Sequence, residues 1–576
     1  MKNKGKSFLK GALVLAAANL VVKIIGAVFK IPLYELIGKE GSGLFNVAYQ
    51  IYTFMFIIAT AGFPIAVSKM VAESMARNDE YDARRIFETA RLLLGVIGLV
   101  GSLILYVFSG KLAAMFGNDA AASCITVISP SVFFVAIVSA YRGYFQGKQN
   151  MYPTAGSEVI EAAAKLGIGI AAAIFVMGLT VNPNLGTDIS FSAREALSAD
   201  VKTRYAASGA IFGVTVGTLL SLILMLTVYA CTEKKAKPLS GQHIRSRGVI
   251  MKDLVVIAIP ITIGASVSSL TSLVDLATIM NRLVVNPAVF DKYAHIFGNG
   301  TEFAANAAAE GWQGKVLLEK MANSLYGMYT GQAQTMFNLP LTMIVALSMS
   351  IVPAISTAVA EKKPGEAVGM TESVLRITML FAAPCAIGLS VLSKPILGLL
   401  YSDTDAYLLL QKLAIAVIFV ALVQVTNAIL QAYGKVYYPV INMLVGGVVK
   451  VAMNYTFIPV WGIDGAPIAT NVCYAVIALL NIICIIRLIK VKISISNMFI
   501  KPIAAAIIMG AAALVANNVF IGAIRSARLS AILAIAVGGV VYAAVILIIK
   551  GIKREDILTM PKGEKIADIL TKYKLL

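Results

Sequence analysis

Long apolar blocks recur along the whole chain and constrain its fold more than any other feature. Each block has roughly 20 to 28 residues, the length at which a helix crosses a hydrocarbon core of about 30 Å. Helices of soluble proteins carry narrow apolar stripes instead. Only 14% of the 576 residues are charged, whereas a soluble domain carries about 25%. The sequence therefore predicts an all-α polytopic membrane protein.

The distribution of basic residues sets the number and direction of the spans. Lys and Arg collect on cytoplasmic loops. With both termini in the cytoplasm, 32 of the 49 fall in the loops and span ends on that side, 12 in the loops and span ends on the other, and five deeper inside spans. This bias fits an even number of spans, and it explains the net charge of +19 without nucleic-acid binding. About fourteen transmembrane helices are predicted, at residues 8–34, 44–68, 88–109, 121–145, 156–180, 206–231, 251–281, 324–358, 371–392, 406–430, 437–459, 465–489, 499–522 and 529–550.

An internal repeat divides these spans into halves. The segment Gly62–Glu73 is echoed by Ile351–Glu361, and Gly147–Pro153 is echoed by Gly434–Pro439. Both echoes lie roughly 285 to 290 residues apart at the ends of matching spans, so the repeat keeps one orientation. Two pseudo-symmetric six-helix lobes are expected, related by an axis along the membrane normal, with a site between them. The predicted parts are an N-lobe at 1–232, a cytoplasmic linker at 233–250, a C-lobe at 251–490, and two further helices with a cytoplasmic tail at 491–576.

Several kinds of chemistry are absent from the sequence. No phosphate-binding loop motif occurs and no loop is long enough to form a soluble catalytic domain, so we expect no enzymatic activity. The only histidines are His243 and His295, both in loops, which argues against a metal site. The five cysteines lie in apolar runs without a C-x-x-C pair and are interpreted as buried hydrophobic residues. No cofactor is predicted.

Charges inside the spans are the informative residues. Lys23 lies mid-span, and Lys30 follows two helical turns later on a nearby face. A cation at mid-membrane costs about 2.5 to 3.5 kcal/mol, so it normally faces a cavity or a partner. The two lysines either hold an anionic group such as a pyrophosphate in a wet cleft or extend to an interface.

Further charges follow the repeat. Lys165 and Lys450 occupy similar places in the fifth and eleventh spans, where each would put a cation near the midline. The alternative for Lys165 is pairing with Glu161 on its own helix. Glu158 and Glu161 share a face with Lys165, and charge pairing is favoured over metal binding there.

The seventh span, the first helix of the second half, carries one plainly mid-span acid. Asp275 is a candidate for binding H⁺ or Na⁺, or it forms a structural ion pair with Arg282, which could itself face the cleft. Intramembrane amides such as Asn46 and Gln50 either join helices or hydrogen-bond sugar hydroxyls in a cavity.

Three segments resemble a known family. They are the run Tyr141-Arg142-Gly143-Tyr144-Phe145-Gln146-Gly147 followed by Met151–Ala155, the segment Gly41–Gln50, and Gly62–Lys69. With the fourteen-span plan, they resemble the SpoVB/YtgP-like polysaccharide-biosynthesis proteins of Gram-positive bacteria. These belong to the multidrug/oligosaccharidyl-lipid/polysaccharide exporter superfamily, which includes MurJ-like flippases and MATE exporters.

The resemblance implies two six-helix lobes around a central cavity and alternating access in the bacterial cytoplasmic membrane. The implied cargo is a sugar on undecaprenyl pyrophosphate, such as lipid II, for cell-wall or polysaccharide synthesis, including sporulation. Basic residues on the first helix of MurJ-like proteins bind the anionic headgroup, and Lys23 and Lys30 fall in the matching stretch.

The alternative within the superfamily is a cation-coupled multidrug exporter, which would place acids in the cavity. Five lysines inside spans favour the flippase. The predicted partners are thus a glycolipid substrate and membrane lipids, and the sequence leaves open the glycan, the coupling ion and the oligomeric state.

Overall fold

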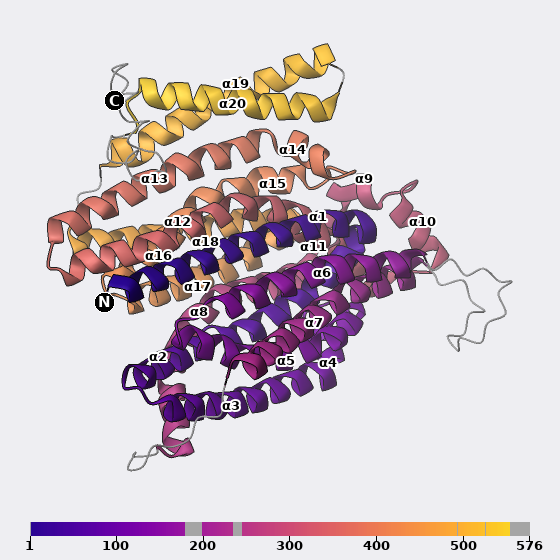
Figure 1. The fold of residues 1–576 in the computed structure, drawn as a ribbon. Helices are drawn as coiled ribbons and strands as arrows, with labels where there is room; N and C mark the ends of the chain where they lie inside the picture. Colours follow the sequence, from indigo (N-terminus) through magenta and orange to yellow (C-terminus); the bar gives the residue numbers. More distant parts are fainter. Residues whose placement is uncertain (1, 179–198, 234–244, 492–493, 525, 553–576) are drawn as a thin grey trace, which may run out of the picture. The chain divides into compact units, whose positions relative to one another are not determined.

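The computed structural model describes residues 2–178, 199–233, 245–491, 494–524 and 526–552 (Figure 1). The described residues contain helices and no strand, which confirms the predicted all-α class. The chain forms two compact units, residues 1–331 and 332–576.

The first unit is built around one long, broken helix. α1 extends from Lys2 to Thr60, and Gly38 interrupts it with φ 65° and ψ −169°, a conformation open to glycine but strained for other residues. α1 packs on α5, α6 and α11. The remaining helices are α2 (Phe63–Ala76), α3 (Glu80–Val107), α4 (Ser109–Met115), α5 (Ala122–Gly147), α6 (Tyr152–Gly178), α7 (Ala199–Thr232), α8 (Arg247–Leu283), α9 (Ala294–Phe297), α10 (Glu302–Ala309) and α11 (Gly314–Met328).

The second unit consists of a helical bundle with two helices appended. α19 and α20 run side by side, and α19 packs on α13 (Figure 1). Its helices are α12 (Gln334–Ala360), α13 (Pro364–Val391), α14 (Ser393–Leu400), α15 (Tyr407–Ala414), α16 (Ala416–Ala432), α17 (Tyr437–Trp461), α18 (Gly465–Cys484), α19 (Lys501–Ile524) and α20 (Ala527–Ile548).

Ten described helices are long and apolar enough to cross a membrane, or up to twelve if two bent pairs are each one span. Two of the ten cover 60 and 53 residues, Ala17–Ala76 and Tyr437–Ile489. A helix of 60 residues would be about 90 Å long, well beyond one bilayer. Gly38 and Gly462, both at positive φ, interrupt these two stretches. The described helices establish a multi-pass membrane protein, and the count of fourteen stays a prediction.

The internal repeat recurs in local structure. α3 and α13 each have 28 residues and begin at Glu80 and Pro364, 284 residues apart. The turns that follow α5 and α16 also match. The amide of Asn150 donates to the carbonyl of Phe145, and that of Lys435 donates to Leu430, 285 residues apart. Both are the six-to-one bonds that close a helix at a left-handed residue.

The predicted lobes and the two compact units divide the chain at different residues. The lobes follow the sequence repeat, whereas the units follow the packing of the helices. The repeat starts its second half at residue 251, whereas α8 and α11 pack on α1 and therefore belong to the first compact unit. Most of the predicted linker at 233–250, and the tail from 553, lie outside the described residues. The lobe division stays a prediction.

A buried ion cluster ties three helices of the first unit together. Lys320 of α11 contacts the carboxylates of Glu40 in α1 and Asp200 in α7. Its ammonium also lies 4.7 Å from the centre of the Trp312 ring. The backbones of α1 and α11 lie close together here, since a Cβ on Gly327 would lie 1.8 Å from the carbonyl oxygen of Lys39. We call Lys320, Glu40 and Asp200 the Lys320 cluster.

Candidate functional site

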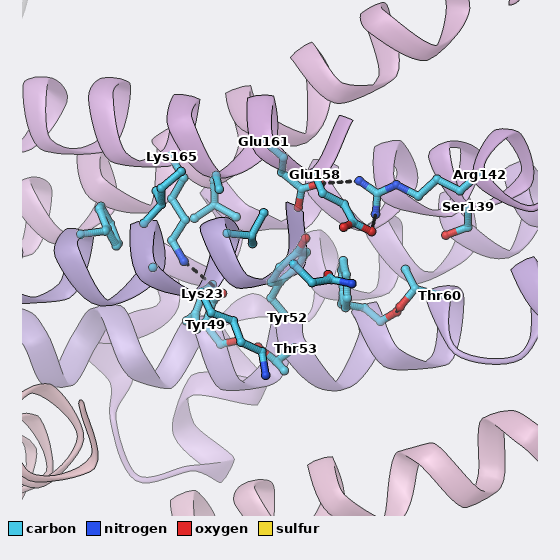
Figure 2. A pocket seen from close by; sticks show the side chains of 18 of the residues that line it. Lys23, Tyr49, Tyr52, Thr53, Thr60, Ser139, Arg142, Glu158, Glu161 and Lys165 are labelled. Carbon is cyan, nitrogen blue, oxygen red and sulfur yellow. Dashed lines mark hydrogen bonds and ion pairs between the residues drawn. The ribbon is translucent and has the colours of Figure 1, made fainter. Parts of the chain in front are cut away.

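A cavity of about 560 Å³ lies in the first unit, lined by residues of α1, α2, α5, α6 and α7. Its charged lining residues are Lys23, Arg142, Glu158, Glu161 and Lys165 (Figure 2). Three cations thus face two carboxylates. A cavity of this size within a bundle fits a small polar headgroup, since ligand pockets commonly measure about 300 to 1,000 Å³.

One face of the second arm of α1 supplies the aromatic and hydroxyl lining. Tyr49, Tyr52, Thr53, Phe56 and Thr60 follow one another at intervals of one, three or four residues. Residues three and four apart share a helix face, so this spacing brings them all to the cavity wall. The rings of Tyr49 and Tyr52 lie 6.0 Å apart, and those of Tyr52 and Phe56 lie 5.8 Å apart.

Arg142 of α5 is the most heavily bonded charge of the cavity. Its Nε donates to Ser157 Oγ at 3.0 Å, and its Nη2 donates to Glu161 Oε2 at 3.0 Å. Nη2 also donates to Ser221 Oγ of α7 at 3.4 Å, and Nη1 lies 4.0 Å from Glu158 Oε1. The guanidinium therefore joins α5 to α6 and α7 and balances one of the two carboxylates.

The family-like run on α5 has two structural roles. Gly143 and Gly147 lie one turn apart against α2, where a Cβ on either would come within 2.8 Å of α2 atoms. Small residues at this spacing let membrane helices approach closely. Arg142 and Gln146, also four residues apart, line the cavity, whereas Tyr141 packs its ring 4.8 Å from Phe87.

Lys165 reaches the cavity without a carboxylate partner among the described residues. Its ammonium donates to Tyr49 Oη at 3.0 Å and lies 4.1 Å and 5.0 Å from the ring centres of Tyr49 and Phe29. The alternative pairing with Glu161 is not formed, because Arg142 holds that carboxylate. Lys23 also lines the cavity, and its side chain is exposed with no ion pair in the described part of the chain.

Three other predicted site residues of α1 do not line the cavity. Lys30 is half-buried one residue beyond Phe29, which does line it. Asn46 is buried and donates to the backbone oxygen and hydroxyl of Ser42, at 2.8 Å and 3.2 Å. Gln50 is half-buried beside Tyr49.

The remaining candidates lie away from this lining. Asp275 is buried within α8, and Arg282 is half-buried near the end of the same helix. Lys450 belongs to the second unit, where it is buried and donates to Thr470 Oγ1 at 2.9 Å. Ion coupling at Asp275 and a substrate role for Lys450 stay predictions.

Two polar atoms of the lining residues lack partners. The hydroxyl of Tyr52, which is 4% exposed, and Oε2 of Glu158 are buried without a hydrogen bond among the described residues. Tyr49 and Tyr52 are not among the site residues predicted from the sequence. Their signal was available, because they share the face of α1 that carries Thr53, Phe56 and Thr60. No group of three or more metal-ligating side chains occurs within the described ranges.

The fold and the cavity define a multi-pass membrane protein of the transporter type, with a charged, ligand-sized site inside its helices. The sequence profile of the polysaccharide biosynthesis protein family matches residues 8–359, and the chain belongs to that family. The profile of lipid II flippase MurJ matches residues 322–535.

Curated relatives and solved structures are also similar to this chain. Stage V sporulation protein B of Bacillus subtilis (strain 168) is 25% identical over 562 residues, 96% of this chain and 98% of the relative. A lipid II flippase MurJ in an inward closed conformation shares the fold at a TM-score of 0.65 and 14% identity, over 93% of this chain and 98% of its own. An inward-facing multidrug resistance MATE transporter of the MOP superfamily gives a TM-score of 0.57 at 13% identity, over 83% and 98%.

Proposed function

We propose that the protein is a flippase that moves undecaprenyl-pyrophosphate-linked sugars, lipid II or a related oligosaccharide, across the bacterial cytoplasmic membrane by alternating access. The observation that carries the proposal is the pair Lys23 and Lys165, two cations that line one cavity without carboxylate partners among the described residues. A membrane-embedded ammonium is costly unless it serves a pathway or a partner. A pyrophosphate supplies that partner.

The aromatic wall supports the same cargo. Phe29, Tyr49 and Tyr52 give the cavity flat apolar surfaces, and the two tyrosines add hydroxyls. Sugars offer hydroxyls and C–H faces to such walls. Sequence similarity supports the same cargo, because the profile of lipid II flippase MurJ matches much of the second unit. Since the fold is shared with multidrug transporters, the cargo has to be argued from the cavity and not from the fold.

Both termini are proposed to lie in the cytoplasm, and the membrane potential or a coupling ion would drive the cycle. The potential contributes about 2.3 kcal/mol per charge per 100 mV. Asp275 is the proposed site for H⁺ or Na⁺, because a buried intramembrane acid is a natural place for either cation.

Complementation tests the proposal directly. The chain is expressed in cells depleted of their lipid II flippase, and growth and inward-facing lipid-linked precursor are measured. We expect rescue by the wild-type chain, and loss of rescue by Lys23→Ala and Lys165→Ala at equal membrane abundance. Lys111→Ala, an exposed lysine on α4 outside the cavity, is the matched control and should rescue fully.

Two results would count against the flippase. Full rescue by both cavity variants would remove the headgroup site. Hypersensitivity to cationic drugs in cells that lack this chain, with normal wall synthesis, would favour the multidrug exporter.

A further inference from the structure

The charges of the cavity are separated along α6. Glu158 and Lys165 lie seven residues apart, about 10 Å along the helix axis. Figure 2 shows Lys23 and Lys165 toward one end of the cavity and Arg142 toward the other. We call Lys23 with Lys165 the lysine pole, and Glu158, Glu161 and Arg142 the glutamate pole.

The glutamate pole is not balanced. Arg142 donates to Glu161 at 3.0 Å but only approaches Glu158, at 4.0 Å. One guanidinium against two carboxylates leaves a net charge of −1, whereas the lysine pole carries +2. A ligand that neutralises both poles therefore carries two negative charges at one end and one positive charge at the other.

The orphaned oxygens lie at this second pole. Tyr52 Oη and Glu158 Oε2 are both buried and unpaired in the described structure. Buried polar atoms without partners are uncommon in native structures, and they mark places where a ligand or water completes the bonding. A carboxylate oxygen only accepts, so Glu158 needs a donor, and the phenol can share the same group.

We propose that the glutamate pole is a subsite for a protonated amine on the cargo, so that the cavity selects a zwitterionic glycolipid. The diphosphate lies at Lys23 and Lys165. The ammonium donates to Glu158 Oε2, and Tyr52 Oη accepts a second of its hydrogen bonds. The inference rests on the proposed function, because it takes the lysine pole as the diphosphate site.

Binding of two matched lipids tests the subsite. The full-length protein in lipid nanodiscs is titrated with undecaprenyl pyrophosphate carrying glucosamine or carrying N-acetylglucosamine, at a pH below the pKa of the free amine. The wild-type chain should bind the amine form about tenfold more tightly, the value of one buried charge-assisted hydrogen bond. Glu158→Gln should bring that ratio close to one, and Tyr52→Phe, which leaves the carboxylate in place, should lower the ratio by a smaller factor.

Matched controls are available outside the cavity. Glu302→Gln, an exposed carboxylate at the start of α10, and Tyr106→Phe, an exposed phenol on α3, should keep the wild-type ratio. Tyr52→Phe removes a single oxygen, so it tests the subsite even where Glu158→Gln is poorly folded.

The possible results distinguish the amine subsite from the flippase function. Equal affinity of the wild-type chain for both lipids overturns the subsite while the flippase stands. A tenfold preference that survives in both cavity variants also overturns it. Failure of the wild-type chain to bind either lipid overturns the diphosphate site and the proposed function with it.

Discussion

Two charged clusters in the first unit are balanced differently. In the Lys320 cluster, one ammonium contacts two carboxylates from other helices and an aromatic ring. In the cavity, Lys165 contacts one phenol and two rings, and Lys23 makes no ion pair among the described residues. The Lys320 cluster thus satisfies its cation with carboxylates of the protein, whereas Lys23 and Lys165 of the cavity have no carboxylate partner among the described residues.

We propose that this difference separates charges that hold helices together from charges that bind a ligand. Burying an ion is costly, and removing its partner exposes that full cost. Replacing one member of a cluster whose charges pair with each other should therefore lower the free energy of unfolding. Replacing a charged residue that has no carboxylate partner in the protein should instead abolish function, with little change in the free energy of unfolding.

The largest expected effect is at Lys320. Lys320→Met should lower the free energy of unfolding by about 3 kcal/mol, because Glu40 and Asp200 would be left close together without a counter-charge. Thermal unfolding in detergent measures the loss. Lys315→Met, on the same helix with an 84% exposed side chain, is the control and should stay within about 0.5 kcal/mol of wild type.

Adding Glu40→Gln and Asp200→Asn to Lys320→Met should recover part of that loss, because the unpaired carboxylates are then gone. No recovery in the triple variant would mean that Lys320 stabilises through packing on Trp312 alone, and the proposed contrast with the cavity would fail.

Arg142 tests whether a charged cavity residue can stabilise the fold as the Lys320 cluster does. Its guanidinium bonds Ser157, Glu161 and Ser221 at once, a fork that an ammonium cannot reproduce. Arg142→Lys should cost about 2 kcal/mol of unfolding free energy through the lost charged hydrogen bonds. Thermal unfolding measures this cost as well.

The same change at the 63% exposed side chain of Arg77 is the control, and it should have no measurable effect. A stable Arg142→Lys protein that no longer transports would move Arg142 into the class of ligand-binding charges.

Much of the fold was predictable from the sequence because each membrane span is a run of contiguous apolar residues. The apolar blocks marked the helices, and the echo of Gly147-Lys148 by Gly434-Lys435 marked two helix ends with the same capping bond. Those signals are local. The break at Gly38 is also local, but in the sequence nothing distinguishes that glycine from its neighbour at Gly41.

The candidate site was predictable only in part. Lys23 and Lys165 were found because a charge within an apolar block is conspicuous. The partners of each charge were not, because they come from distant segments. Lys320 meets Glu40 across 280 residues, and Arg142 displaces Lys165 as the partner of Glu161. Neutral lining residues such as Tyr52 give no such signal, since aromatic residues occur throughout the spans.

Lys165 gives a smaller effect on stability and a large one on function. Lys165→Gln should cost about 1 kcal/mol of unfolding free energy, from one hydrogen bond and two cation–π contacts. Transport in the complementation assay should nevertheless be lost. If Lys165→Gln instead unfolds as easily as Lys320→Met while its residual folded fraction transports normally, the lysine pole is structural.

The smallest effect is expected at Asn46, a predicted cavity residue that the structure turns toward Ser42. Asn46→Ala removes two bonds to a residue on its own helix and gains helix propensity of about 0.6 kcal/mol, so the two contributions nearly cancel. Unfolding should shift by less than about 0.5 kcal/mol, and growth rescue should match wild type. Loss of rescue at normal stability would mean that another state of the transport cycle brings Asn46 into the cavity. The boundary between structural and ligand-binding residues would then have to be drawn separately for each state.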